Sequence, residues 1–412
     1  MNAEGSKPVR IGLLGRGTVG AAFAELLAER ADAVEAATGR RPEISGALTR
    51  SEGDFEAILA GSDLVVELMG GTEPAREHVL AALRAGKPVV TANKQLLAQH
   101  GDELFAVARE AGVQLRFEAA VAAVIPIVRT IQESFGVTEI AKVFGIVNGT
   151  TNFILSEMAA TGAGYDEVLG RAQELGYAEA DPSDDVSGAD AAAKMAILAR
   201  LAFHTPVTLS EVAYEGIEAI QPDDLAYAKE LGLSLKLLGV AERRDGGISV
   251  RVFPCFLYPG HPLAPIEGPF NAVMVEAPAI TEVTMSGPGA GGLQTASAVL
   301  GDVVSILAGD APVHETRVEL PIVADVTSSF YLHLEVADQP GVLARVATVL
   351  GDHDVSVKSV VQRGIGDEAR LVMVIHECLE SRFAAALEAL AKLDELRSPP
   401  RSIRVIEEEY SA

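Results

Sequence analysis

The sequence predicts an α/β protein in three parts: a doubly wound parallel sheet, a mixed α+β domain and a small separate C-terminal domain. Three observations support this prediction. Strand-like apolar runs alternate with helical patterns over the first 145 residues, which is typical of a parallel sheet covered on both faces by helices. Long helical patterns then precede strand-like runs, and a fresh strand–turn–helix–strand pattern begins at Phe330.

The composition fits a globular protein and excludes several partners. The chain has 412 residues, 49% of them hydrophobic, which is enough for two or three domains. Asp and Glu number 58 against 33 Lys and Arg, and the formal charge of -25 makes nucleic acid an unexpected partner. No window reaches the roughly 18 apolar residues of a membrane span, and the two cysteines have no metal-ligand or redox spacing. We therefore expect a cytoplasmic protein without a membrane segment.

The first domain is expected over residues 1–145. Val9–Leu14 is an apolar run that stops at a glycine, and residues 19–30 carry apolar side chains at helical spacing. Helical patterns separate the further strand-like runs, which lie at residues 43–48, 63–68, 88–91 and 113–117. This order predicts a sheet of the Rossmann type.

A glycine-rich turn joins the first strand to the first helix. Its G-x-G-x-x-G spacing allows a tight turn and a close approach to a pyrophosphate, whose charge meets the helix N-terminus. Because the motif follows a strand and opens a helix, it favours a dinucleotide site over a glycine turn without a ligand. The residues expected to bind are Gly15, Arg16, Gly17, Thr18, Val19 and Gly20.

The end of the second strand bears on the choice between NAD and NADP. A carboxylate there would accept hydrogen bonds from the ribose 2′-hydroxyl of NAD. Residues 44–50 end without an acid, and Arg50 can pair with the 2′-phosphate of NADP. The residues favour NADP, with NAD possible; a surface arginine without a cofactor role is the alternative.

Residues 146–310 are expected to form the α+β domain. The patterns predict helices over residues 150–160, 165–176 and 184–203, and strands near 236–241, 248–257, 271–276 and 280–285. A further helix over residues 290–310 is expected to return to the first domain. Repeated prolines indicate a linker over residues 311–328, and residues 329–412 are expected to form the small C-terminal domain.

Two lysines stand where proton chemistry is possible. Lys94 follows the fourth strand, so it belongs at the carboxyl edge of the sheet, where ligands of parallel sheets bind. In ADPSDDVSGADAAAK, Asp190 and Lys194 share a helix face among small and apolar residues. A lysine there would be partly desolvated and held by its aspartate, which suits proton transfer. The alternatives are a solvated lysine at the helix start and an ordinary surface ion pair; the segment lacks the ligand spacing of an EF-hand.

Seven motifs, in order along the chain, resemble homoserine dehydrogenase over roughly residues 9–320. They are GLLGRGTVG, VVELMGG, TANKQLLAQHG, RFEAAVAAVIPI, IVNGTTNFIL, AQELGYAEADPSDDVSGADAAAKMAILA and SGPGAGG. The long segment over residues 172–199 resembles the signature of the family. The C-terminal residues 329–412 resemble an ACT domain, which implies a ferredoxin-like fold and a regulatory role.

The resemblance implies NAD(P)-dependent interconversion of L-homoserine and L-aspartate 4-semialdehyde, a step towards threonine, methionine and isoleucine. By matching positions, Lys194 corresponds to the proton donor and Lys94 to a second lysine at the reacting centre. Glu179 and Asp190 correspond to residues that hold the substrate, with Asp185 nearby. The positions that resemble cofactor-lining residues are Thr91, Lys94, Asn148, Gly149 and Gly287.

The same resemblance implies a monovalent cation such as Na+. The matching ligands are Glu118 and the backbone carbonyls of Val121, Ala123 and Ile125. This loop reads EAAVAAVIP, whereas family members usually carry a small serine and paired glycines there. Backbone carbonyls can bind a cation whatever the side chains are. The substitutions in this loop matter only if they change its backbone conformation.

In the tail, the resemblance to an ACT domain implies an amino-acid site. Asp338 and Gly341 lie in the turn that corresponds to the ligand-binding turn, and Gln362 lies on the second strand of the pattern. Threonine feedback inhibition is the implied regulation. Because ACT domains usually pair, a homodimer or homotetramer is expected.

Three alternatives fit parts of the sequence. A phosphorylating semialdehyde dehydrogenase needs a nucleophilic cysteine, but Cys255 lies in the apolar run VRVFPCFLY with no base beside it. A hydroxy-acid dehydrogenase is expected to use a histidine base, but His204 and His261 lie outside any matching motif. A non-catalytic amino-acid sensor has no need of both Lys94 and Lys194.

Overall fold

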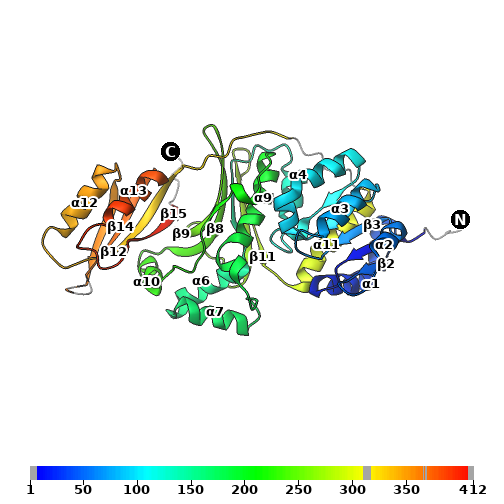
Figure 1. Ribbon diagram of the computed structural model, residues 1–412, viewed down its shortest axis with the longest axis horizontal. Helices are drawn as coiled ribbons and strands as arrows, with labels where there is room; N and C mark the ends of the chain where they lie inside the picture. Colours follow the sequence, from blue (N-terminus) through cyan, green and yellow to red (C-terminus); the bar gives the residue numbers. More distant parts are fainter. Residues whose placement is uncertain (1–6, 310–316, 365, 367–368, 407–412) are drawn as a thin grey trace.

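The computed structural model describes residues 7–309, 317–364, 366 and 369–406, and within these the strands form two sheets (Figure 1). The first sheet has the order β2-β1-β3-β4-β5, and its neighbouring strands are parallel, as predicted. Because β1 lies between β2 and β3, the order reverses there, and ligands of such sheets bind at the carboxyl ends of these strands. The strands are β1 Val9–Leu14, β2 Pro42–Leu48, β3 Leu64–Glu67, β4 Val89–Thr91 and β5 Leu115–Arg116.

Helices cover both faces of this sheet. On one face, α1 (Thr18–Thr38) and α11 (Gly292–Ala308) bury Phe23 and Val299 against Ile11 and Leu13. On the other, α3 (Ala75–Arg84) and α4 (Lys94–Ala111) contribute to a core that includes Val65 and Val89. The short α2 spans Phe55–Gly61. The late helix α11 therefore packs against the first domain, although it follows the whole of the second domain in the sequence.

The second sheet contains strands of the middle segment in the order β11-β10-β6-β8-β9. Its first strand, β6 (Lys142–Ile146), pairs with β8 and β10. The expected boundary at residue 145 thus falls inside a strand of the second sheet, and the chain changes sheet before Lys142. The other bounds are β7 Ala213–Tyr214, β8 Ser234–Arg244, β9 Gly247–Leu257, β10 Phe270–Ala277, β11 Thr281–Pro288, α6 Gly149–Thr161, α7 Tyr165–Glu174 and α10 Pro222–Glu230.

The helix predicted over residues 184–203 is two helices in the structure. They are α8 (Ser183–Val186) and α9 (Ala189–Phe203), and the break lies at Gly188, which has a φ of 86°. A Cβ at Gly188 would lie 2.9 Å from the backbone oxygen of Glu215. Both the left-handed conformation and the close backbone approach require glycine. The break places Asp190 in the first turn of α9.

The C-terminal domain has the βαββαβ order of a ferredoxin-like fold, as predicted. Its strands follow the order β15-β12-β14-β13, and β15 pairs in parallel with β9, so the second sheet continues into this domain. Part of the expected linker, residues 310–316, lies outside the described residues, and Ile322 forms a bridge to Ile248. The bounds are β12 Thr327–Glu335, α12 Val342–Asp352, β13 Val357–Arg363, β14 Arg370–Leu379, α13 Glu380–Leu390 and β15 Arg401–Ile406.

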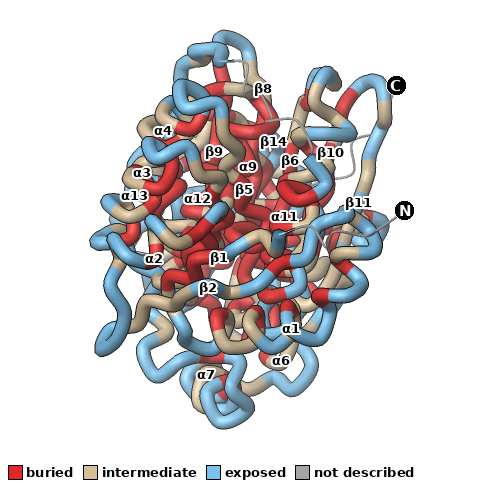
Figure 2. The backbone as a smooth tube through the Cα atoms, turned by 90° about the vertical axis from the view of Figure 1, so that its right-hand side faces the viewer, coloured by how far each residue is buried: buried red, intermediate tan, exposed pale blue. Residues whose placement is uncertain are grey.

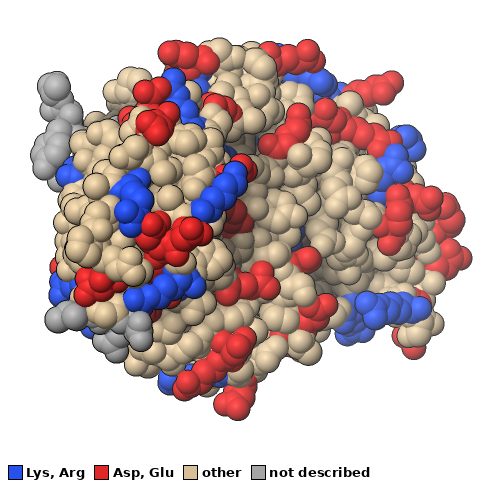
Figure 3. All heavy atoms as spheres, turned by 60° about the vertical axis from the view of Figure 1, so that its left-hand side comes forward, with Lys and Arg blue, Asp and Glu red and all other residues tan. Residues whose placement is uncertain are grey.

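Burial and charge divide the molecule into interior and surface as expected for a globular chain. The strands β1, β3 and β4 of the parallel sheet and the helix α9 are largely buried, and the loops around them are exposed (Figure 2). The edge strand β2 is mostly of intermediate exposure. Asp and Glu side chains spread over the face shown in Figure 3, beside smaller groups of Lys and Arg. This distribution agrees with the formal charge of -25.

Candidate active site

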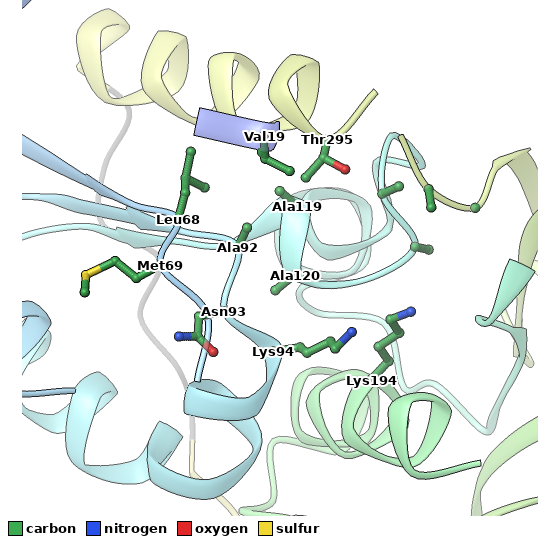
Figure 4. A pocket seen from close by; sticks show the side chains of 15 residues that line it. Val19, Leu68, Met69, Ala92, Asn93, Lys94, Ala119, Ala120, Lys194 and Thr295 are labelled. Carbon is green, nitrogen blue, oxygen red and sulfur yellow. The ribbon is translucent and has the colours of Figure 1, made fainter. Parts of the chain in front are cut away.

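A cavity of about 320 Å³ lies at the carboxyl edge of the parallel sheet, where α4 and α9 meet. Figure 4 shows Val19, Leu68 and Thr295 at one end of it and Lys94 and Lys194 at the other. Residues of both the first and the second domain therefore line one space. The lining residues are Val19, Leu68, Met69, Gly70, Ala92, Asn93, Lys94, Ala119, Ala120, Ala122, Ala123, Lys194, Gly289, Ala290 and Thr295.

The glycine loop has the geometry of a phosphate cradle. A Cβ at Gly15, which has a φ of 98°, would lie 2.5 Å from the backbone oxygen of Leu68. A Cβ at Gly20 would lie 2.1 Å from the backbone oxygen of Gly15, so α1 can approach the strand only with glycine there. At Gly17, by contrast, a Cβ would have nothing within 4 Å, and no side chain caps α1. The open space and the free helix N-terminus fit the pyrophosphate of a dinucleotide.

The ends of β3 and β4 are tied together by a buried carboxyl group that the sequence patterns did not reveal. Glu67 accepts hydrogen bonds from the Thr91 hydroxyl at 2.5 Å and from the backbone N–H of Met69 at 2.7 Å. Burial raises the pKa of Glu67, and these hydrogen bonds oppose the rise. Asn93 caps α4 by accepting from the backbone N–H of Leu96 at 3.0 Å. These contacts fix the start of α4, where Lys94 lies.

Asp190 lies between two lysines from different domains. Its Oδ2 atom accepts a hydrogen bond of 2.6 Å from Lys194 Nζ, and its Oδ1 atom forms an ion pair with Lys94 Nζ. Lys194 Nζ also donates to the backbone oxygen of Val147 at 2.7 Å. The Asp190 side chain is 3% exposed and that of Lys94 is 37% exposed. The predicted spacing of Asp190 and Lys194 is thus a real contact, and it is buried rather than on the surface.

Burial and charge act in opposite directions on these groups. Burial would raise the pKa of Asp190, but the two ammonium groups outweigh it and hold that pKa below its ordinary value. Burial lowers the pKa of Lys194, and the charge of Lys94 adds to this effect while Asp190 opposes it. Burial would also lower the pKa of Lys94, but Asp190, with Asp185 and Asp184, raises it above its ordinary value. Lys194 is therefore the lysine that loses its proton more easily.

Asn148 joins the two acids to the second sheet. Its Nδ2 atom donates to Asp185 Oδ1 at 2.7 Å and to Asp190 Oδ2 at 2.9 Å. Its Oδ1 atom accepts from the backbone N–H of Thr151 at 2.8 Å and so caps α6. Burial, followed by the charge of Asp190, raises the pKa of Asp185. One amide therefore orients both carboxyl groups beside the lysines.

Comparison with known proteins identifies the family. The model described as homoserine dehydrogenase matches residues 126–304, that of the homoserine dehydrogenase NAD binding domain matches residues 15–118, and the ACT domain matches residues 331–395. The homoserine dehydrogenase of Neisseria gonorrhoeae is 39% identical over 430 residues, covering 97% of this chain and 99% of the relative. The chain belongs to the homoserine dehydrogenase family.

Solved structures agree with this assignment. A homoserine dehydrogenase from Thiobacillus denitrificans is 38% identical, with a TM-score of 0.91 over 97% of this chain and 99% of that chain. A hyperthermophilic archaeal homoserine dehydrogenase mutant in complex with NADPH is 29% identical, with a TM-score of 0.64 over 75% of this chain and 100% of that chain. As a homoserine dehydrogenase, this chain is an oxidoreductase that acts on a CH–OH group and uses a nicotinamide dinucleotide.

Glu179, which is expected to bind the substrate, does not line the cavity. The Glu179 side chain is exposed. Its backbone oxygen accepts a hydrogen bond of 3.1 Å from Gln173 Nε2. Its loop is held near Asn148 because the Thr150 hydroxyl donates to the backbone oxygen of Tyr177 at 2.7 Å. Substrate binding by Glu179 therefore stays a prediction.

The remaining cofactor positions differ in how close they come to the cavity. Arg16 and Arg50 are exposed, and Arg50 lies just beyond Leu48, whose backbone oxygen accepts from the N–H of Gly15 at 2.9 Å. A Cβ at Gly149 would lie 2.9 Å from the backbone oxygen of Pro269. Gly287 is near the cavity without lining it, whereas Gly289 and Ala290, which follow it, do line it. Thr91 does not line the cavity, because its hydroxyl donates a hydrogen bond to Glu67.

The expected cation loop keeps an unusual backbone conformation. Ala122 and Ala123 both have a φ of 54°, in the left-handed region that favours glycine. The Glu118 carboxylate is buried and accepts from the backbone N–H groups of Val128 at 2.8 Å and Arg129 at 2.9 Å. Burial raises the pKa of Glu118 to about 7. Within the described residues, no group of three acidic, His or Cys side chains could hold a metal. A cation here would depend on backbone oxygens, and its binding stays a prediction.

The predicted regulatory residues lie on a turn and on an edge strand of the C-terminal domain. Gly341 has a φ of 94° and precedes α12, and Asp338 Oδ2 accepts from the backbone N–H of Gly366 at 3.0 Å. Gln362 is exposed on β13, which lies at the edge of the sheet. Ligand binding by these three residues therefore stays a prediction.

The groups required by the alternative functions lie away from the cavity. Burial raises the pKa of the Cys255 thiol to about 12, which makes it a poor nucleophile. Burial lowers the pKa of His261 to about 4, and its ring packs edge-on against Phe144. Neither residue lines the cavity, nor does His204. None of the helices within the described ranges has the length and apolar character needed to cross a membrane.

Proposed function

We propose that the chain interconverts L-homoserine and L-aspartate 4-semialdehyde, on the route to threonine, methionine and isoleucine, with Lys194 as the proton-transfer group. The observation that carries this proposal is the cluster of Lys194 and Lys94 around the buried Asp190, at the end of the cavity away from the glycine loop. Lys94 acts as the second lysine at the reacting centre. Asp190 and Glu179 hold the hydroxyl and amino groups of the substrate, and Asp185 supports them.

Proton transfer accounts for both directions of the reaction. In reduction, the Lys194 ammonium gives a proton to the aldehyde oxygen, which becomes the hydroxyl group of homoserine. In oxidation, the neutral Lys194 amine takes the proton from that hydroxyl group. The bound nicotinamide dinucleotide supplies or accepts the hydride. Because only the neutral amine accepts a proton, oxidation is favoured at alkaline pH, and the lowered pKa of Lys194 brings this range closer to neutrality.

A direct assay tests the activity. Purified protein receives L-homoserine with NADP or NAD at alkaline pH, and absorbance reports the reduced nicotinamide. We expect homoserine-dependent reduction of the nucleotide. If no reduced nucleotide forms with either cofactor, the proposed reaction is wrong.

We propose that NADP is preferred over NAD because the second strand presents a cation instead of an acid. Arg50 is exposed just beyond the end of β2, beside the glycine loop, where it can meet a 2′-phosphate. The archaeal relative in complex with NADPH supports the proposal. We expect Arg50→Ala to raise the KM for NADP and to leave the KM for NAD unchanged. Arg40→Ala, which removes another exposed arginine of the same domain, is the matched control, and equal effects of both variants would contradict the proposal.

We propose that a monovalent cation such as Na+ binds in the loop through Glu118 and the carbonyl oxygens of Val121, Ala123 and Ile125. The left-handed conformation of Ala123 and the buried carboxyl groups of Glu118 and Asp302 nearby support a cation here. The test compares the thermal midpoint and the turnover in Na+ with those in a bulky organic cation at equal ionic strength. We expect both to be higher in Na+; identical values would contradict the proposal.

We propose that the ACT domain binds threonine and inhibits the reaction, with Asp338, Gly341 and Gln362 in the ligand site. The left-handed turn before α12 and the exposed edge strand β13 support this site. Threonine should lower the rate in the wild type and have a weaker effect in Gln362→Ala. A rate that is unchanged by millimolar threonine would contradict the proposal.

We propose further that pairing of β13 edges makes the protein a homodimer or homotetramer. Val360 and Val361 on β13 are 42% and 40% exposed, and the strand has a neighbour on one side only among the described residues. Light scattering coupled to size exclusion measures the mass directly. A monomer at all concentrations would contradict this assembly.

A further inference from the structure

The two lysines of the cluster are carried by two neighbouring helices that belong to different domains. α4 begins at Lys94 and α9 contains Lys194, and the helices lie side by side (Figure 1). Buried residues of both helices, such as Leu104 and Ile197, belong to one continuous core. The ion pair between Lys94 and Asp190 joins their first turns. The relative position of these helices therefore sets the distance between the reacting groups.

A second ion pair joins the same helices farther along. Arg200 Nη1 on α9 contacts Asp102 Oδ1 on α4, and the Arg200 guanidinium lies 4.7 Å from the centre of the Phe105 ring. With a rise of about 1.5 Å per residue, Asp102 lies about 12 Å along α4 from Lys94, and Arg200 lies about 15 Å along α9 from Asp190. The helices thus run in the same direction and are joined at two points.

The contact surface between the two ion pairs leaves little space. Gly101 of α4 is buried, and a Cβ there would lie 3.3 Å from the Phe105 ring and 3.9 Å from Arg200 Nη1. The Arg200 side chain is 8% exposed, and that of Asp102 is 45% exposed. Arg200 is therefore enclosed by the contact surface, and Asp102 closes it from the solvent side.

We propose that the Arg200–Asp102 ion pair positions the nucleotide-binding domain against α9 and thereby holds Lys94 next to Asp190 and Lys194. The Lys94–Asp190 contact is poorly suited to do this alone, because the Lys94 side chain is partly exposed and Asp190 also binds Lys194. A shift of about 1 Å between reacting groups can cost roughly 100-fold in rate. This inference rests on the proposed role of Lys194, and it assigns Arg200 and Asp102 as positioning residues.

The test compares an ion pair between the domains with an ion pair inside the first domain. Asp102 also lies 3.8 Å from Arg317, so Arg200→Met, which leaves Arg317 in place, isolates the contact with α9. Asp102→Asn and Arg200→Met break the contact between domains, and Asp102→Glu keeps its charge. The matched control is Glu103→Gln, because Glu103, the next residue of α4, pairs at 2.7 Å with Arg76 of α3 inside the first domain. We expect Asp102→Asn and Arg200→Met to lower kcat about 10- to 100-fold with the KM for NADPH unchanged, and Asp102→Glu to recover most of the loss.

The pH profile separates positioning from a loss of folding. Lys194 faces Asp190, Asp185 and Lys94, and the charge of Lys94 lowers the pKa of Lys194. When α4 moves away, the charge of Lys94 lowers the pKa of Lys194 less. The rise of homoserine oxidation with pH should therefore move to higher pH in Asp102→Asn and Arg200→Met but not in Glu103→Gln. Circular dichroism verifies that each variant is folded. If Arg200→Met does not fold, the kcat and pH profile of Asp102→Asn test the positioning role, because Asp102 is half-exposed.

A wild-type kcat and pH profile in folded Asp102→Asn would overturn the positioning role, and so would an equal loss in Glu103→Gln. An inactive wild-type protein would instead contradict the proposed reaction. The two failures are therefore distinguishable, because the first leaves homoserine oxidation by the wild type intact.

Discussion

Replacing Asp190 by Asn removes the negative charge that lies between Lys94 and Lys194 and nearly preserves the shape of the side chain. The Asp190–Lys194 contact is 2.6 Å long, so its Coulomb attraction is about 6 kcal/mol at an effective dielectric constant of about 20. This attraction favours the charged form of Lys194 and therefore opposes the lowering of its pKa by burial. Without the Asp190 charge, burial and the charge of Lys94 are less opposed, so we expect the pKa of Lys194 to fall further below its ordinary value.

The sign of the effect on stability follows from this fall. In the unfolded chain Lys194 has its ordinary pKa of 10.5, and in the folded variant its pKa lies further below that value than in the wild type. The loss of folding stability is fully present below the pKa that Lys194 has in the folded variant. It disappears as the pH rises towards 10.5, because Lys194 is then neutral in both states. Loss of one partner from a buried ion pair costs about 3–5 kcal/mol, so the deficit should be of this size near neutral pH.

Thermal unfolding across a range from about pH 7 to about pH 10 measures the effect. We expect the midpoint of Asp190→Asn to lie below that of the wild type near pH 7 and to approach it near pH 10. Asp184→Asn removes an exposed acid of the same segment and should show no such trend. A deficit that is constant over the whole range, or absent, would refute the claim that Asp190 holds the charge of Lys194.

Three further predictions concern other parts of the molecule. Lys94→Met removes a positive charge that lowers the pKa of Lys194, so the midpoint of homoserine oxidation against pH should move upwards. Gly17→Ala should leave the thermal midpoint unchanged, because a Cβ there meets nothing within 4 Å, but should weaken NADPH binding at least about tenfold in a fluorescence titration, since the Cβ enters the phosphate space. Asp224→Asn should lower the free energy of unfolding by about 1–3 kcal/mol, measured by calorimetry, because the buried carboxyl group of α10 lies 3.2 Å from His333 Nδ1 of the ACT domain.

Each of these predictions has an outcome that counts against it. An unchanged pH midpoint in Lys94→Met would mean that the two lysines do not interact. Wild-type NADPH affinity in Gly17→Ala would place the pyrophosphate elsewhere. If Asp224→Asn unfolds like the wild type, this carboxyl group does not stabilise the contact between α10 and the ACT domain.

The sequence predicted the parts of the fold that depend on local patterns. The glycine turn after β1 and the spacing of Asp190 and Lys194 are both local, since each is set within a few residues of one element. The helix break at Gly188 was missed because the helical pattern of the side chains continues across it. The need for glycine at the break comes from the close approach of the Glu215 backbone, which lies on another segment.

Contacts between distant segments could not be predicted from single patterns. The pairing of β15 with β9 joins two domains that the sequence separates, and no periodicity specifies which edges meet. The burial of Glu67 depends on hydrogen bonds from β4 and from the turn after β3. The residues alone offered Lys94 as an isolated candidate, and its contact with Asp190 became visible only when α4 and α9 were placed side by side.

The central claim is that Lys194 transfers the proton in the oxidation of homoserine. The most direct measurement is the initial rate of NADPH formation from L-homoserine by the wild type and by Lys194→Ala at alkaline pH, with NADPH binding measured on the same samples. Loss of a positioned acid–base group should lower the rate about 10²- to 10⁴-fold while NADPH binding stays at the wild-type level. A folded Lys194→Ala variant that forms NADPH at the wild-type rate would contradict the claim.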